Sequence, residues 1–309
     1  MSRSVLLAAA RSERLKDVTE RVALTRRLVA RYVAGASESD VIRVAGDLVG
    51  DGFTVSIDRL GEHTRDLGQA MRVADTYVSV LDELHRAELS ARVEVSVKLS
   101  AIGQAFHGDG DRVALDHARR ICHAARNAGT TVTVDMEDHT TTDSTLNILR
   151  ELRLDFPETG AVLQAYLRRT EGDCRDLAHA GSRVRLCKGA YDEPPSVAFM
   201  RKADVDRSYV RCAKILLSGP GYPMLATHDP RLVEITGALA SKYHRLQGSY
   251  EYQMLYGVRP EEQRRLVRAG EEVRVYVPYG EDWYGYLVRR LAERPANLSL
   301  FLRSVASKR

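Results

Sequence analysis

The pattern of hydrophobic and polar residues changes near residue 50. Residues 1–50 carry apolar positions at helical spacing, with Thr19 and Ser37 as N-caps of helices that end near residues 34 and 50. From residue 53 onward, short β-rich runs alternate with charged, periodic stretches of helical length. The runs cover residues 53–57, 93–99, 131–136, 161–165, 183–187, 224–227, 249–255 and 273–277. The pattern predicts an N-terminal helical arm over residues 1–50 and an α/β unit over residues 51–309.

Eight alternating strand and helix units favour a (βα)8 barrel. The usual barrel has about 250 residues, and this chain has 309 residues, of which 44% are hydrophobic. A doubly wound sheet is the alternative, but it predicts a glycine-rich first turn that the sequence lacks. Functional groups of a barrel gather at the C-terminal ends of its strands. Polar residues occupy such positions here: Asp58, Lys98, Asp135, Gln164, Lys188, His228, Gln253 and Tyr276.

The last helical stretch has an unusual polar face. It opens at Glu281 and Asp282 and closes at Pro295. Helical spacing places four polar residues on one face: Tyr286, Arg289, Arg290 and Glu293. Two adjacent guanidinium groups beside a phenol suit a flat carboxylate, because each guanidinium donates two parallel hydrogen bonds and keeps its charge. The face therefore predicts a site for a small acid; a solvated face with surface ion pairs is the alternative.

Lys98 is a second candidate. It ends a run in which Glu94, Ser96 and Lys98 share one strand face. A lysine at that position points either to solvent or into the barrel mouth. In the mouth it would bind substrate or form a Schiff base, as in an aldolase.

The segment from Asp135 to His139 contains three acids and an imidazole within five residues. Successive strand residues face opposite ways, so Asp135, Glu137 and His139 are the members that could converge on a metal. No second histidine or cysteine cluster has ligand spacing. We therefore expect no metal and favour a catalytic role for Asp135, with a turn and helix cap as the alternative.

Polar residues occur at three later strand ends, and the pair of cations at one of them suits an anionic cofactor. Gln164 interrupts an apolar strand and needs a partner for its amide. Arg185 and Lys188 flank a strand end that is followed by Gly189, which permits close approach of a ligand. His228 precedes Asp229-Pro230, which has the pattern of an N-cap and first helical residue. A structural role for Gln164 and His228 is the alternative.

Composition narrows the class of protein. The formal net charge is +4, from 46 basic and 42 acidic residues spread along the chain. The sequence has no basic block of the kind that binds nucleic acid, although a mildly cationic face could meet anionic lipid. The four scattered cysteines form no CxxC pair, which indicates reduced thiols in a cytosolic setting. The apolar run 5–10 is too short for a secretory or membrane-spanning segment.

The motifs together resemble those of monofunctional, flavin-dependent proline dehydrogenases. The run Tyr276 to Gly280, followed by Tyr286-x-x-Arg289-Arg290-x-x-Glu293-x-x-x-Asn297, is similar to that family's C-terminal signature. Other similar motifs occur in chain order: Lys98 in Val-Ser-Val-Lys, Asp135-Met136-Glu137, Gln164, Arg185-Leu-Cys-Lys188-Gly189-Ala190-Tyr191, Thr227-His228 and Glu251-Tyr-Gln-Met-Leu255. Asp192 departs from the pattern, since some relatives carry tryptophan there.

The resemblance implies a distorted (βα)8 barrel with the last helix over its mouth. It also implies FAD as cofactor, oxidation of L-proline to Δ1-pyrroline-5-carboxylate and transfer of electrons to a quinone, as the first step of proline catabolism to glutamate. The implied location is the cytoplasm, with peripheral contact to the inner face of the cell membrane. The rival interpretations are a Schiff-base lyase that uses Lys98 and a non-enzymatic basic helical protein that binds an acidic partner.

The resemblance also implies a role for each matched residue. The residues expected at the reacting atoms are Asp135, Arg185 and Tyr276. Those expected to bind substrate are Lys98, Tyr191, Leu255, Tyr286, Arg289 and Arg290. Those expected to bind the cofactor are Met136, Gln164, Arg185, Lys188, Gly189, Ala190, Lys202, Thr227, His228 and Glu293. For Lys202, which lies in a run of charged residues, a solvated position is the alternative.

Overall fold

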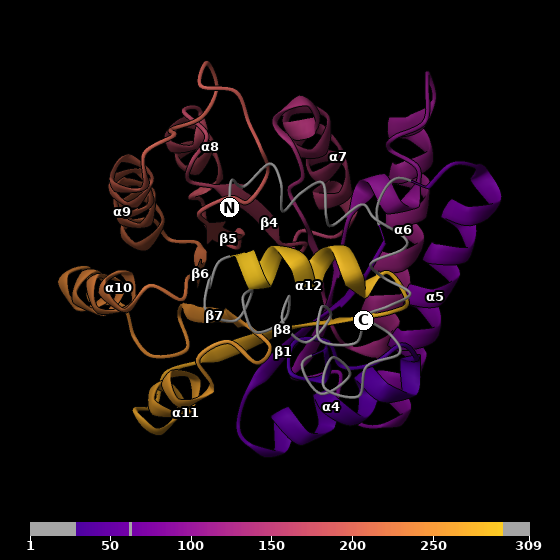
Figure 1. Cartoon of the computed structure of the whole chain (residues 1–309), viewed down its shortest axis with the longest axis horizontal. Helices are drawn as coiled ribbons and strands as arrows, with labels where there is room; N and C mark the ends of the chain where they lie inside the picture. The colour runs from indigo at the N-terminus through magenta and orange to yellow at the C-terminus, as the bar shows by residue number, and fades with distance from the viewer. Residues whose placement is uncertain (1–28, 62–63, 293–309) are drawn as a thin grey trace, which may run out of the picture.

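Eight parallel strands form the centre of the molecule (Figure 1). The computed structural model describes residues 29–61 and 64–292. The strands are β1 (Thr54–Arg59), β2 (Val93–Val97), β3 (Val132–Val134), β4 (Ala161–Gln164), β5 (Arg183–Cys187), β6 (Tyr222–Ala226), β7 (Glu251–Leu255) and β8 (Val273–Tyr279). All eight predicted runs overlap these strands, and run 183–187 has the same bounds.

The strands close into a barrel. The lateral order is β3-β2-β1-β8-β7-β6-β5-β4, so β8 returns to pair with β1. Between β3 and β4 the contact is a single bridge from Thr133 to Gly160. Two backbone hydrogen bonds support it, from Val134 N to Gly160 O at 2.9 Å and from Gly160 N to Val132 O at 2.8 Å. The ring is therefore closed, with β3–β4 as its weakest joint, and the doubly wound alternative is wrong.

Helices surround the strands (Figure 1). They are α4 (Glu38–Gly50), α5 (Leu67–Arg86), α6 (Gly110–Ala128), α7 (Thr142–Asp155), α8 (Thr170–Leu177), α9 (Lys202–Ser218), α10 (Pro230–Lys242), α11 (Pro260–Arg268) and α12 (Trp283–Ala292). Local sequence sets several of the starts. Ser37 and Asp40 form a capping box at α4, and Asp229 caps α10 with Pro230 as its first residue, as predicted.

The main apolar core lies between the strands and the helices. Val93, Val95 and Val97 of β2 are at most 1% exposed and belong to this core. The alternate residues Glu94 and Ser96 are equally buried but point into the barrel, where they meet polar side chains from other strands. Since successive strand residues face opposite ways, the alternation makes the barrel interior polar.

Helix α4 contributes to the same core through Val41, Val44 and Ala45. Just before it, the chain follows the end of β8: Ala34 N donates to Pro278 O, and Gly280 N donates to Gly35 O, both at 2.9 Å. The helix predicted to end near residue 50 is confirmed by α4. The helix predicted from Thr19 lies mostly outside the described residues, and the division at residue 50 stays a prediction.

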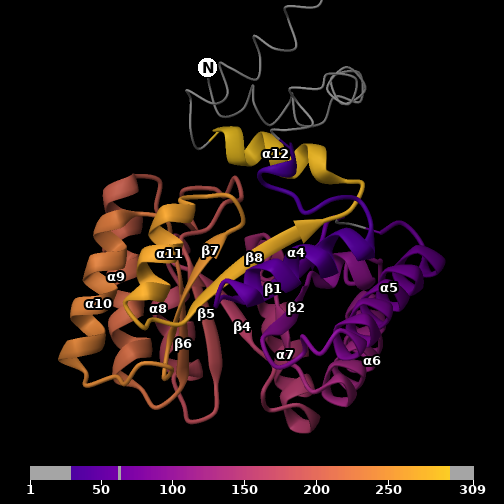
Figure 2. The same ribbon diagram turned by 90° about the horizontal axis from the view of Figure 1, so that it is seen from below.

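Helix α12 lies across the end of the barrel toward which β8 points (Figure 2). Tyr284, Tyr286 and Leu287 are at most 6% exposed, so this helix packs on the protein. The expected position of the last helix over the barrel mouth is confirmed. Its predicted closure at Pro295 falls outside the described residues.

Gly160→Ala should weaken the barrel at its closing joint. A Cβ atom at Gly160 would lie 2.5 Å from Thr133 Oγ1, and such overpacking costs about 1–3 kcal/mol of the free energy of unfolding. Gly172→Ala is the matched control, because Gly172 lies in α8 and a Cβ atom there would have no neighbour within 4 Å, and alanine stabilises a helix by about 0.5–1 kcal/mol. Urea denaturation of both variants measures the difference; equal stabilities would contradict the prediction.

Candidate active site

The parallel strands bring the predicted polar residues to one end of the barrel. Asp58 lies in β1, Lys98 and Asp135 follow β2 and β3 directly, and Gln164 ends β4. Lys188 and Thr227 follow β5 and β6 directly, Leu255 ends β7 and Tyr276 lies in β8. C-terminal ends of parallel strands share one rim, so these residues surround the mouth that α12 covers.

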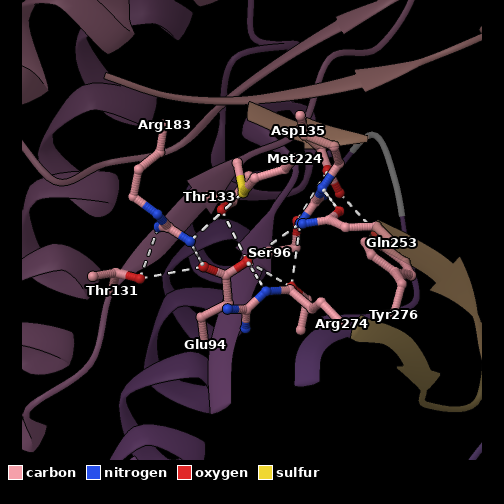
Figure 3. A network of polar contacts seen from close by, with 12 residues as sticks. Glu94, Ser96, Thr131, Thr133, Asp135, Arg183, Met224, Gln253, Arg274 and Tyr276 are labelled. Carbon is pink, nitrogen blue, oxygen red and sulfur yellow. Dashed lines mark hydrogen bonds and ion pairs between the residues drawn. The ribbon is translucent and has the colours of Figure 1, made fainter. Parts of the chain in front are cut away.

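Asp135 is held by residues from three other strands (Figure 3). Its Oδ1 accepts hydrogen bonds from Arg185 Nη1 at 2.8 Å and Ser96 Oγ at 2.9 Å. Its Oδ2 accepts one from the Tyr276 hydroxyl at 2.7 Å. Three donors therefore fix this carboxylate. The three residues predicted to be catalytic, Asp135, Arg185 and Tyr276, form one connected group.

Arg185 is the centre of that group. Its side chain is 5% exposed, its Nε donates to Gln253 Oε1 at 2.6 Å and its Nη2 to Ser56 Oγ at 3.2 Å. Its guanidinium carbon also lies 5.2 Å from the centre of the Tyr276 ring, within the range of a cation–π interaction. A guanidinium so deeply buried needs most of its N–H groups paired, and these contacts provide that.

Deeper in the barrel, Glu94 is surrounded by arginines (Figure 3). Its Oε2 lies 2.7 Å from Arg183 Nη2, and its Oε1 lies 3.4 Å from Arg185 Nη2 and 3.9 Å from Arg274 Nε. Burial alone would raise the pKa of the Glu94 carboxyl. The charges of Arg183, Arg274 and Arg185 outweigh burial and hold that pKa well below its usual range.

The sequence analysis assigned no role to the ion pairs that Glu94 forms with Arg183 and Arg274 deeper in the barrel. Arg274 also pairs with Glu251, from Nε to Oε1 at 2.8 Å. The signal was present as polar residues two apart in strands, since Glu94 precedes Ser96, Glu251 precedes Gln253 and Arg274 precedes Tyr276. Such spacing places both members of each pair inside the barrel.

Asp58 is an acid at the mouth whose role the sequence did not predict. It is 2% exposed, and Lys98 Nζ contacts its Oδ1 directly. The same Nζ lies 3.9 Å from Asp135 Oδ2. Burial raises the pKa of the Asp58 carboxyl to about 6; the charge of Lys98 opposes this rise and that of Asp135 adds to it. Lys98 thus lies in the mouth between two carboxylates, not in solvent.

The segment after β3 is divided among separate partners. Glu137 accepts hydrogen bonds from Ser100 N at 3.0 Å and Ser100 Oγ at 2.6 Å. His139 contacts Glu193 through its Nδ1. Asp135, Glu137 and His139 therefore do not converge, and within residues 29–61 and 64–292 no group of three or more potential metal ligands occurs. Met136 is 7% exposed at the same rim.

Gln164 and His228 both have structural partners. Gln164 Nε2 donates to the carbonyl oxygen of Glu137 at 2.6 Å. His228 Nε2 accepts from Leu255 N at 2.9 Å. Thr227 Oγ1 accepts from Asp229 N at 3.2 Å. These contacts fix the rim between β4 and β7, and they leave the predicted cofactor contacts as predictions.

Lys188 and Lys202 share two carboxylates at the starts of α9 and α10. Lys188 Nζ lies 2.6 Å from Asp206 Oδ1 and 3.2 Å from Asp229 Oδ2, and Lys202 Nζ lies 2.6 and 3.1 Å from the same two residues. Burial would raise the pKa of Asp229, but hydrogen bonds from Arg231, Lys202 and Lys188 hold it below its usual range. The cluster carries a net positive charge because three cations face two acids.

Gly189 has a conformation that few other residues adopt. Its φ is +104°, and a Cβ atom there would lie 2.2 Å from the Tyr166 ring. Glycine therefore lets the chain pass over Tyr166. Ala190, the next residue, is exposed, and Tyr191 packs partly buried against Tyr166 and Leu167.

The remaining predicted substrate residues lie on β7 and α12. Leu255 is partly buried and Tyr286 is 6% exposed. Arg289 and Arg290 belong to α12, but their side chains are outside what the structure describes, as is all of Glu293. The carboxylate site predicted from this helix face stays a prediction.

In the part of the chain that the structure describes, no helix is long and apolar enough to cross a bilayer.

Comparison with known proteins identifies relatives over most of the chain. The family model described as proline dehydrogenase matches residues 41–303. Proline dehydrogenase 1 of Bacillus subtilis is 36% identical over 284 residues, which cover 92% of each chain. Proline dehydrogenase of Deinococcus radiodurans is 38% identical over 280 residues, which cover 90% of each chain.

A longer protein of known structure has a similar barrel. This is proline utilization A (PutA) from Bdellovibrio bacteriovorus, crystallised after inactivation by N-propargylglycine. It superposes with a TM-score of 0.83 at 25% sequence identity. The match covers 97% of the present chain but 39% of that chain, so the present chain corresponds to one part of it.

Glu94→Gln should destabilise the fold strongly. Removing one partner from a buried ion network leaves uncompensated charge and costs about 3–5 kcal/mol. Because the folded-state pKa of Glu94 is lowered, its contribution is fully present above the unfolded value near 4.5 and is lost as pH falls below that value. The stability difference from wild type should therefore be largest near neutral pH and shrink in acid. Denaturant titrations at several pH values measure it, and a constant difference would contradict the assignment.

Proposed function

The chain belongs to the proline dehydrogenase family, and from this premise we propose that it oxidises L-proline to Δ1-pyrroline-5-carboxylate with bound FAD. The observation that carries the proposal is the connected group of Asp135, Arg185 and Tyr276 at the barrel mouth, with Lys98 beside it. It supplies fixed charges of both signs where a zwitterionic amino acid would bind.

The donor set on the β5–β6 side fits a flavin dinucleotide. Lys188 and Lys202 lie by the starts of α9 and α10, and helix N-termini together with cations suit a pyrophosphate. Gly189 directly follows Lys188, and its lack of a Cβ atom lets the backbone pass close to the Tyr166 ring. When bound, the flavin would accept the hydride that the substrate carbon loses.

We assign the remaining cofactor contacts by the family resemblance. They are Met136, Gln164, Arg185, Ala190, Thr227, His228 and Glu293. Arg185 would lie near the reacting ring of the flavin, where a fixed cation stabilises the negative charge that develops on reduction. Its burial and pairing with Asp135 support this role.

Substrate recognition would divide between the barrel and α12. We propose that Arg289 and Arg290 bind the carboxylate, while Lys98, Tyr191, Leu255, Tyr276 and Tyr286 shape the pocket for the ring. Asp135 would act beside the ring nitrogen. Holding the ring in one orientation lowers the entropic part of the activation barrier.

Electrons taken from proline must leave the protein before the next turnover. We propose a quinone as their acceptor, reached by peripheral contact of a cytoplasmic protein with the inner face of the cell membrane. The net charge of +4 is compatible with attraction to anionic lipid.

The contacts of Lys98 argue against a Schiff-base lyase. In the resting site the two carboxylates of Asp58 and Asp135 stabilise its ammonium form, whereas a Schiff-base lysine must already be a neutral amine when its carbonyl substrate binds. The family assignment likewise rejects the non-enzymatic binding protein.

The purified protein should be yellow and should release FAD on denaturation. Anaerobic addition of L-proline should bleach the oxidised flavin, because hydride transfer reduces it, and a soluble quinone should restore the colour. Absorption spectroscopy measures each step, with a proline-free sample as control. Colourless protein that stays inactive after FAD is added would overturn the proposal.

Arg289→Met and Arg290→Met should each reduce kcat/KM for proline by roughly 30-fold or more, because loss of one desolvated charge partner costs about 2–5 kcal/mol. A surface ion pair would be worth about 0–1 kcal/mol. The loss against pyrrolidine, which lacks the carboxylate, should be much smaller. Arg264→Met is the control, since Arg264 forms an exposed pair with Glu261 on α11. Equal losses on both substrates would show that these arginines do not bind the carboxylate.

A further inference from the structure

Asp58 is a buried acid that has no role in the reaction proposed above. It lies at the C-terminal end of β1, in register with Ser96 of β2 and Pro278 of β8. Its side chain is 2% exposed and that of Lys98 is 11% exposed. Lys98 is therefore the more accessible member of the pair, with Asp58 behind it.

Asp58 and Asp135 differ in how their oxygens are occupied. Both oxygens of Asp135 accept hydrogen bonds, from Ser96, Arg185 and Tyr276. One of these donors, Arg185, is a guanidinium, which does not give up its proton. Asp58 contacts the ammonium group of Lys98, which can transfer a proton, and a hydrogen bond with Tyr276 also acts to lower the pKa of its carboxyl.

The groups around Asp58 also allow it to accept a proton. Those facing it in the described structure are Lys98 after β2, Asp135 after β3, Tyr276 and Tyr279 of β8, and Tyr77 of α5. Burial raises the pKa of all three tyrosines above its usual value, so they stay neutral. Burial raises the pKa of Asp58 to about 6, close to the range in which a carboxyl group works as a base near neutral pH.

We propose that Asp58 is the final proton acceptor of a relay that removes the proton from the substrate's ring nitrogen through Lys98. This proposal rests on the proposed oxidation of proline. Lys98 Nζ gives one proton to Asp58 Oδ1, and the resulting neutral amine takes a proton from the substrate's ammonium group. Lys98 regains its charge, Asp58 becomes a carboxylic acid, and the nitrogen lone pair becomes available as the neighbouring carbon loses hydride. Asp58 acts through Lys98, so it is a positioning residue.

The first test is the pH dependence of flavin reduction by proline between about pH 5 and 9. The wild-type rate should fall as pH drops through about 6, because protonated Asp58 cannot accept a further proton. Asp58→Asn should be roughly 100-fold slower or more and should lack this fall. Asp58→Glu should keep the fall and recover part of the rate. An Asp58→Asn variant with the wild-type profile would overturn the relay.

The second test asks whether Asp58 and Lys98 act as a unit. If they do, the double variant Asp58→Asn/Lys98→Met should be no slower than the slower single variant. Rate losses that multiply would mean two independent roles and would overturn the relay.

The third test needs no turnover. Infrared spectra of the oxidised protein should show the carbonyl band of a buried carboxylic acid growing as pH falls through about 6, and Asp58→Asn should lack that band. A band that persists in the variant belongs to another acid and would overturn the assignment. Failure of the proposed function itself would be distinct, since wild-type protein would then not be reduced by proline at any pH.

Discussion

The pairing of Arg185 inside the barrel is the constraint on which the rest of the site depends. This guanidinium comes from β5 and reaches acceptors on β1, β7 and the ends of β2 and β3. A charge removed from water must have partners, or its desolvation would oppose folding. The partners of Arg185 lie on strands that are far apart in sequence. Satisfying it therefore ties these strands together across the barrel interior and holds Asp135 in position.

The number of cations near each buried acid decreases from the inside of the barrel to its mouth. Glu94 faces three arginines, so it keeps its charge despite burial. Asp58, nearer the rim, faces one cation and the additional negative charge of Asp135. The two acids are almost equally buried, at 2% exposure each. Their pKa values shift in opposite directions because they have different numbers of neighbouring cations. Glu94 inside the barrel therefore keeps its charge, whereas the raised pKa of Asp58 near the mouth suits the proposed proton transfer.

Sequence patterns predicted the strands and the rim because both are local. Val93, Val95 and Val97 alternate with Glu94 and Ser96, and this alternation showed which face of β2 was polar. The partner of each polar group could not be predicted in the same way. Arg274 lies near Glu94 only because β8 returns to β1, a contact that spans nearly the whole barrel. Arg289 and Arg290, by contrast, were assigned from helical spacing and from the family resemblance, both of which are read from a short stretch of sequence.

Neighbouring strands of the barrel wall are not joined equally strongly. Four residue pairs join β4 to β5, whereas a single bridge joins β3 to β4. The barrel wall is therefore a ring with one weak joint, between β3 and β4. Helix α7 connects these two strands along the chain. Asp135 stands on one side of that joint and Gln164 on the other, linked across the rim by the bond from Gln164 to the Glu137 carbonyl. Any opening motion of the barrel wall would therefore first change the distance between Asp135 and Gln164 across the mouth.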